Sequence, residues 1–139
     1  MNCWMLAANI FCRQAVIERK ISITGSSTER DFIPITFIED LIEFIIKNPS
    51  SFSDQKIMNV GSGVSMSIYE LSNLIAERCL ALFDFSPKIT INDVHEENGV
   101  SQLEYVCDIY EKLDIGTTTT LSEEIDNLLL FCDKEFNYS

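Results

Sequence analysis

Few side chains of this chain could do chemistry, and Arg30 is the clearest candidate among them. It stands in Glu29-Arg30-Asp31-Phe32, directly before an apolar stretch. A guanidinium is planar and permanently charged, and its paired N–H groups match two oxygens of a phosphate or carboxylate. Arg30 is therefore a candidate anion ligand. The alternative is a surface arginine that pairs with the neighbouring carboxylate of Asp31 or Glu29.

Two further patterns bear on cofactor or substrate binding. Gly61-Ser62-Gly63 lies between an apolar run and a helical pattern, as in loops whose backbone N–H groups cradle a pyrophosphate. The third glycine of that fingerprint is missing, because position 66 is Met, so a tight turn is the preferred interpretation. His95 is the single histidine; it could hydrogen-bond a substrate, or be an ordinary surface side chain.

The elements around Arg30 are predicted from the stretch that runs from Glu29 to Gly63. A strand is expected first, and Thr36-Phe37-Ile38-Glu39 then has the form of a capping box, which predicts a helix from Phe37. That helix is apolar except for a stripe of Glu39, Glu43 and Lys47, so it should be buried on more than one side. After a loop, Lys56–Val60 is predicted as a short strand that enters the glycine turn.

The remaining elements follow from periodicity and capping signals. Residues 3–19 are predicted as a helix with Trp4, Ala8, Phe11, Ala15 and Ile17 on its inner face. Helices are also expected over residues 68–83 and from residue 121 onward, because each follows a Ser/Thr-x-x-Glu capping box. Residues 21–25 and 88–92 are predicted strands, and residues 93–101 are predicted as a loop.

Composition excludes several classes of function. The chain has 139 residues, of which 46% are apolar, and this is enough for one domain with a core. The net charge is −12, and residues 93–139 alone carry twelve acidic residues against Lys112 and Lys134. Nucleic acid is therefore an unsuitable partner, since its recognition depends on clusters of Lys and Arg. The acidic end is interpreted as a solvated helix face, with an acidic docking surface as the alternative.

Cysteine usage and hydropathy indicate a reducing, cytoplasmic setting. The five cysteines, at positions 3, 12, 79, 107 and 132, are odd in number and widely spaced, which supports neither a disulfide framework nor a zinc site. Residues 4–11 are apolar but lack the basic residue and cleavage site of a signal peptide, so an amphipathic helix is expected there. No run is long enough to predict a membrane span, and neither a membrane nor a metal is expected.

Two segments resemble a known family. RDFIPITFIEDL and KIMNVGSGVSMSIYELSNLIAERC are similar to the C-terminal part of extended short-chain dehydrogenases, the NAD-dependent nucleotide-sugar epimerase/dehydratase family of oxidoreductases and isomerases. The resemblance is strongest over residues 21–79 and weaker over the acidic residues 93–139. It implies an α/β fold for residues 1–139 as one substrate-side region, with helices, a few short strands and no N-terminal Rossmann core.

The resemblance also implies roles for particular residues. Arg30 matches an arginine that clamps the diphosphate of a nucleotide-sugar, Ser22-Ile23-Thr24 match a strand that lies over the nucleoside, and Val64 matches a residue near the base. No catalytic or cofactor-binding residue is expected in this chain, because no tyrosine has a lysine four positions later as the Tyr-x-x-x-Lys pair requires. The family's second phosphate-binding arginine is also missing, since the corresponding segment is residues 95–99, His-Glu-Glu-Asn-Gly.

Two functions are consistent with these observations. The first is the substrate-binding portion of an NAD-dependent epimerase/dehydratase-like oxidoreductase acting on a nucleotide-sugar, inactive by itself, with NAD(P) bound by a separate or upstream Rossmann half. The second is a non-catalytic binding or protein-interaction module derived from that lobe. In either case the apolar helix from Phe37 should leave an open face, which favours self-association.

Overall fold

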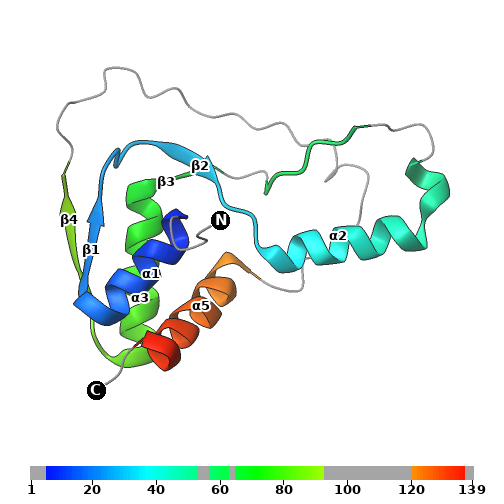
Figure 1. Cartoon of the computed structure of the whole chain (residues 1–139). Coiled ribbons are helices and arrows are strands. Elements are labelled where there is room, and N and C mark those ends of the chain that lie inside the picture. The colour runs from blue at the N-terminus through cyan, green and yellow to red at the C-terminus, as the bar shows by residue number, and fades with distance from the viewer. Residues whose placement is uncertain (1–5, 53–56, 63–64, 93–119, 137–139) are drawn as a thin grey trace.

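The computed structural model describes residues 6–52, 57–62, 65–92 and 120–136, and the structure is of the α/β class. Its elements are α1 (Ala7–Glu18), β1 (Lys20–Ile23), β2 (Glu29–Asp31), α2 (Ile35–Lys47), the 3-10 helix η2 (Pro49–Phe52), β3 (Ser65–Ser67), α3 (Ile68–Phe83), β4 (Lys88–Ile91) and α5 (Leu121–Phe136). Figure 1 shows α1, α3 and α5 gathered beside β1 and β4, while α2 extends away from them. The predictions for Trp4, Val64, His95 and residues 93–101 lie outside the described residues.

The predicted strands at residues 21–25 and 88–92 are confirmed as β1 and β4, which form a parallel pair. The register runs from Lys20 opposite Lys88 to Ile23 opposite Ile91. The chain then turns at Gly25, whose φ of +64° is a conformation that favours glycine, and a Cβ there would lie 2.8 Å from Thr28 Oγ1. This turn leads the chain from β1 into β2 and towards Arg30.

The main core lies where α1, α3 and α5 pack against one another and against β1. The three predicted helices are confirmed, and their inward residues form one cluster with β1: Phe11, Cys12, Ala15, Val16, Ile21, Ile23, Ile68, Leu71, Ile75, Cys79, Ile125, Leu129 and Cys132. Ile17 was predicted on the inner face of α1, but it is exposed, since Val16 and Ala15 take the inward positions. A bidentate ion pair from Arg78 Nε and Nη2 to Asp126, at 2.7 and 2.6 Å, ties α3 to α5.

Two of the three predicted capping boxes are confirmed. Ser67 Oγ accepts a hydrogen bond from the Glu70 N–H at 3.1 Å, and Glu70 Oε2 accepts one from the Ser67 N–H at 2.7 Å. Thr120 and Glu123 make the same reciprocal pair at the start of α5, at 3.3 and 2.6 Å. Both boxes depend only on residues three positions apart, so the sequence contains everything that they require.

The third predicted capping box is wrong. Helix α2 begins at Ile35 rather than Phe37, and its N-cap residue is Pro34, which offers no side-chain cap. The Thr36 N–H donates instead to Glu124 Oε1 of α5 at 3.2 Å, and Thr36 Oγ1 is buried without a hydrogen-bond partner among the described residues. A carboxylate 88 residues away thus replaces the local cap, because the tertiary fold brings α5 to the start of α2.

The strand predicted at Lys56–Val60 is also wrong over residues 57–60, which carry no strand pairing. Met58 and Val60 do face inward, as a strand pattern predicts, and they pack with Leu41 in a small second cluster beneath α2. A strand additionally requires a hydrogen-bonded neighbour, and no described strand lies beside this segment. The next strand along the chain is β3 at Ser65–Ser67, which was not predicted and which pairs antiparallel with β2.

Candidate ligand-binding site

Arg30 is held on the short ribbon of β2 and β3, opposite Met66. Its side chain is exposed, and Nη1 donates a hydrogen bond to the backbone oxygen of Glu29 at 2.7 Å. Across residues 6–52, 57–62, 65–92 and 120–136, no ion pair includes Arg30. The surface ion pair considered from the sequence is therefore not formed within that part of the chain.

Asp31 has a different role from its neighbour. Its two carboxylate oxygens accept hydrogen bonds from the Ser62 N–H, at 3.0 and 2.8 Å. A carboxylate that accepts from a backbone N–H anchors that segment of chain. Asp31 therefore fastens the Gly61-Ser62 turn to the end of β2.

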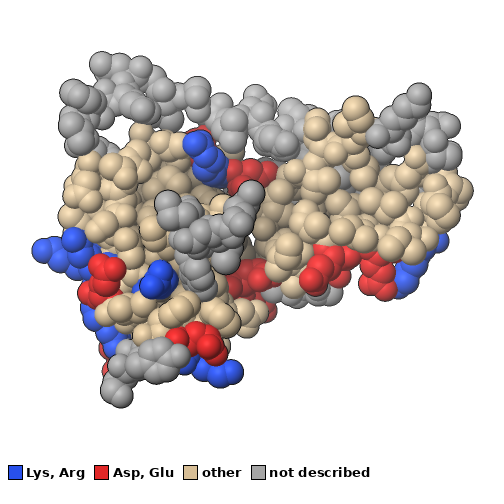
Figure 2. All heavy atoms as spheres, viewed as in Figure 1, with Lys and Arg blue, Asp and Glu red and all other residues tan. Residues whose placement is uncertain are grey.

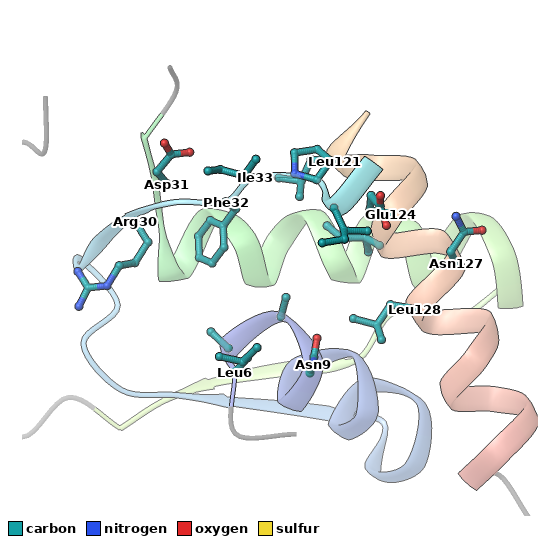
Figure 3. A pocket seen from close by; sticks show the side chains of 15 residues that line it. Leu6, Asn9, Arg30, Asp31, Phe32, Ile33, Leu121, Glu124, Asn127 and Leu128 are labelled. Carbon is teal, nitrogen blue, oxygen red and sulfur yellow. The ribbon is translucent and has the colours of Figure 1, made fainter. Parts of the chain in front are cut away.

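A cavity of about 660 Å³ lies beside Arg30, between the start of α1, residues 30–35 and the first turns of α5 (Figure 3). Its volume is in the range of small-molecule sites. Its apolar lining consists of Leu6, Ala7, Ala8, Phe32, Ile33, Pro34, Ile35, Leu121, Ile125 and Leu128. Its polar lining consists of Asn9, Arg30, Asp31, Glu124 and Asn127.

The polar groups are not spread evenly around the cavity. Figure 3 shows Arg30 at one end, with its guanidinium pointing away from Glu124 and Asn127, which lie at the other end on α5. Glu124 is occupied by the Thr36 N–H at the start of α2. A ligand could thus place an anionic group at the Arg30 rim and extend along the apolar walls towards α5.

Of the predicted substrate-binding residues that the structure describes, only Arg30 lines this cavity. Ser22 and Ile23 are on β1, where the Ser22 N–H donates to Gln14 Oε1 at 3.0 Å and the Ile23 oxygen accepts from the Asn92 N–H at 2.9 Å. Ile23 is buried in the core, and Thr24 is exposed beyond the end of β1. Val64 lies outside the described residues, so a shared site for Arg30, Ser22, Ile23, Thr24 and Val64 stays a prediction.

No signal in the sequence predicts the part of the site that α5 contributes. Glu124, Asn127 and Leu128 come about 90 residues after Arg30, and they read only as the surface and inner face of an amphipathic helix. Asn9 likewise reads as an ordinary position on α1. No local motif joins these positions, and only the packing of α1 on α5 brings them together.

Three free thiols meet in the core: Cys12 on α1, Cys79 on α3 and Cys132 on α5. Burial raises the pKa of Cys79 to about 11 and that of Cys132 to about 11. The pKa of Cys12 is also raised, by burial first and then by the other two thiols. Among the described residues no group of His, Cys, Asp or Glu has an arrangement that could hold a metal ion. Buried thiols of this kind behave as small apolar side chains.

Helix α2 carries an exposed apolar stripe. Ile35, Ile42 and Ile46 are 61%, 52% and 72% exposed. Figure 2 shows acidic side chains along one edge of this part of the molecule. On α2, Glu43 pairs with Lys47. Within the described part of the chain, no helix is both long and apolar enough to cross a membrane.

Comparison with known proteins supports the fold. No protein-family model matches the sequence, and no curated protein matches it. A solved structure described as RMD from Pseudomonas aeruginosa complexed with NADPH matches 92% of this chain, with a TM-score of 0.60 and 16% sequence identity. The match spans 41% of that longer chain. The α/β fold of this chain is thus similar to part of the fold of an NADPH-bound protein.

Proposed function

We propose that this chain is the C-terminal, substrate-side portion of an NAD(P)-dependent epimerase/dehydratase-like oxidoreductase, and that Arg30 binds the diphosphate of a nucleotide-sugar. The observation that carries the proposal is the position of Arg30. Its guanidinium lies at the rim of a cavity large enough for a small molecule, and it has no ion-pair partner among the described residues. A guanidinium in that setting suits phosphate oxygens.

The structural similarity supports a proposal in which the cofactor is bound by a part of the protein outside this chain. The chain spans 41% of a protein that was solved with NADPH. In the proposed arrangement the remaining part, supplied by a partner or by the same polypeptide, carries the glycine-rich cofactor loop and the proton-transfer pair. Ser22, Thr24 and Val64 would contact the nucleoside end of the substrate, and Ile23, whose side chain is buried in the core, would hold that strand in place.

The test is a comparison of nucleotide-sugar binding to the 139-residue chain and to two arginine variants. Arg30→Ala should weaken binding of UDP-glucose or GDP-mannose by about 1.5–3 kcal/mol, the scale of a hydrogen bond to a charged group. Arg13→Ala is the matched control, because Arg13 is exposed but lies over the Phe136 ring instead of the cavity. Equal affinities in the wild-type chain and Arg30→Ala would refute the role of Arg30.

Cofactor binding is tested in the same calorimetric experiment. The chain alone should show no micromolar affinity for NADPH, since its sequence has no complete phosphate-cradling loop. Micromolar affinity would overturn the assignment of the cofactor to the other half.

A second function is favoured by the exposed stripe of α2. A helix with Ile35, Ile42 and Ile46 on its surface resembles a protein-interaction face more than a solvated helix. The chain would then be a non-catalytic binding or interaction module. A cooperative, monomeric unfolding transition of the 139 residues, together with no nucleotide-sugar binding, would favour this function over the first.

A further inference from the structure

We propose that the cavity beside Arg30 receives an apolar group, so that the ligand is an amphiphilic anion. Its phosphate or diphosphate head would lie on Arg30, and a hydrocarbon-rich body would fill the cavity. The inference rests on the proposed role of Arg30 as an anion ligand, and the sugar of a nucleotide-sugar would then lie outside this cavity. Whatever phosphate ester binds, the part that enters this cavity is not a polyhydroxylated ring.

The walls of the cavity carry this inference. Ten apolar residues line it, from Leu6 and Ala7 on α1 to Leu128 on α5. A hydroxyl group that is buried against such walls loses its water without gaining a hydrogen-bond partner, which disfavours binding. Each methylene group buried there strengthens binding, by up to about fourfold.

Neutral polar groups are few among the described residues of the lining. In that part of the chain, Asn9 and Asn127 are the uncharged polar side chains that line the cavity. A hexose presents several hydroxyls, each of which needs donors and acceptors in the right places. These two amides, one on α1 and one on α5, suit a few polar substituents rather than a ring of hydroxyls.

The charged groups fix the direction of the ligand. Asp31 and Glu124 are the acidic residues of the lining, and each already accepts a backbone hydrogen bond, from Ser62 and Thr36. Figure 3 places Asp31 beside Arg30, so Glu124, at the far end on α5, is the carboxylate that opposes a phosphate entering the cavity. The anionic head must therefore remain outside at the Arg30 rim, and the uncharged body must point towards α5 (Figure 3).

The experiment measures binding of simple phosphate esters to the full 139-residue chain by calorimetry. The probes are inorganic phosphate, glucose 1-phosphate, and butyl, hexyl and octyl phosphate below their micelle concentrations. We expect at least tenfold tighter binding of octyl than of butyl phosphate, and glucose 1-phosphate no tighter than inorganic phosphate. A detergent-like effect is excluded by octyl trimethylammonium, which has the same tail and the wrong charge and should not bind.

Two isoleucines of α2 supply a matched pair of variants that should leave the core intact. Ile35 is exposed and lines the cavity, whereas Ile42 is exposed on the same helix and does not. Ile35→Gln should weaken octyl phosphate binding severalfold and leave inorganic phosphate unchanged. Ile42→Gln should change neither. Arg30→Ala should weaken binding of every phosphate ester by at least about tenfold.

The outcomes separate this inference from the proposed function. If glucose 1-phosphate binds tighter than octyl phosphate and Arg30→Ala weakens the binding of both, Arg30 is an anion site and the apolar-ligand inference is wrong. If Ile42→Gln weakens the binding of octyl phosphate as much as Ile35→Gln does, the octyl tail of the ligand lies on the surface of α2 and not in the cavity. The inference is then again wrong. If Arg30→Ala changes nothing, the proposed function fails together with the inference.

Discussion

Replacement of Glu124 tests the most consequential contact that the structure reveals, the capping of α2 by α5. The local pattern predicts that Glu39 caps this helix with Thr36, whereas the structure assigns the role to Glu124, whose Oε1 accepts the Thr36 N–H at 3.2 Å. Glu124→Ala should therefore destabilise the chain, and Glu39→Ala should not, because Glu39 is exposed and makes no capping contact. Each variant removes a glutamate side chain, one from the capping position in the structure and the other from the capping position that the sequence predicts.

The magnitude follows from what Glu124→Ala removes. Loss of a helix cap costs about 0.5–2 kcal/mol. The 3.2 Å hydrogen bond is long for an ionised acceptor, which places its share near 1 kcal/mol or below. Loss of a negative charge near the N-termini of α2 and α5 adds about 0.3–1 kcal/mol. We expect a total near 1.5 kcal/mol for Glu124→Ala and less than about 0.5 kcal/mol for Glu39→Ala.

Urea unfolding followed by circular dichroism gives the free energies, and hydrogen exchange locates the effect. The amides in the first turn of α2 should lose protection in Glu124→Ala and keep it in Glu39→Ala. Glu124→Gln retains the hydrogen-bond acceptor without the charge, so its free energy of unfolding should fall by less than that of Glu124→Ala and by more than that of Glu39→Ala. If Glu39→Ala proves the more destabilising, the local capping box exists in solution and the tertiary cap does not.

Three further predictions concern pH, the buried thiols and the open face of α2. Hydrogen bonds from Ser67 and from Thr120 lower the pKa of Glu70 and of Glu123 below the ordinary value of 4.5. The stabilisation from these carboxylates is therefore present above about pH 4.5 and is lost as the pH falls through the lower folded pKa. Glu70→Gln should make the free energy of unfolding depend less on pH in that window, and an unchanged dependence would contradict this. Burial raises the pKa of Cys79 and Cys132 to about 11. These thiols ionise first in the unfolded chain, so the free energy of unfolding should fall as the pH rises above about 9. Neither thiol should react with Ellman's reagent until the chain unfolds, which mass spectrometry of the labelled protein can check. The predicted self-association should involve α2, so Ile46→Glu should lower the weight-average mass in sedimentation and reduce dye binding relative to the wild-type chain, while a monomeric wild type would remove the basis for this prediction.

The sequence by itself determined the elements whose causes are local. Helix α3 occupies residues 68–83 as predicted, because Ser67 and Glu70 contain both halves of its cap, and the apolar spacing along it selects one buried face. The start of α5 is predicted for the same reason from Thr120 and Glu123. Arg30 could also be named as a candidate anion ligand, since its charge and its place after β1 are readable without knowledge of any distant contact.

Tertiary structure alone decided the features that depend on residues far apart in the chain. Pro34 and Glu124 set the start of α2, because the acceptor that satisfies Thr36 comes from another helix. Residues 57–60 have the alternation of a strand but no described neighbour to pair with, so the pattern was insufficient. The cavity exists because α1 and α5 meet beside residues 30–35, and its apolar character could not be read from segments about 90 residues apart.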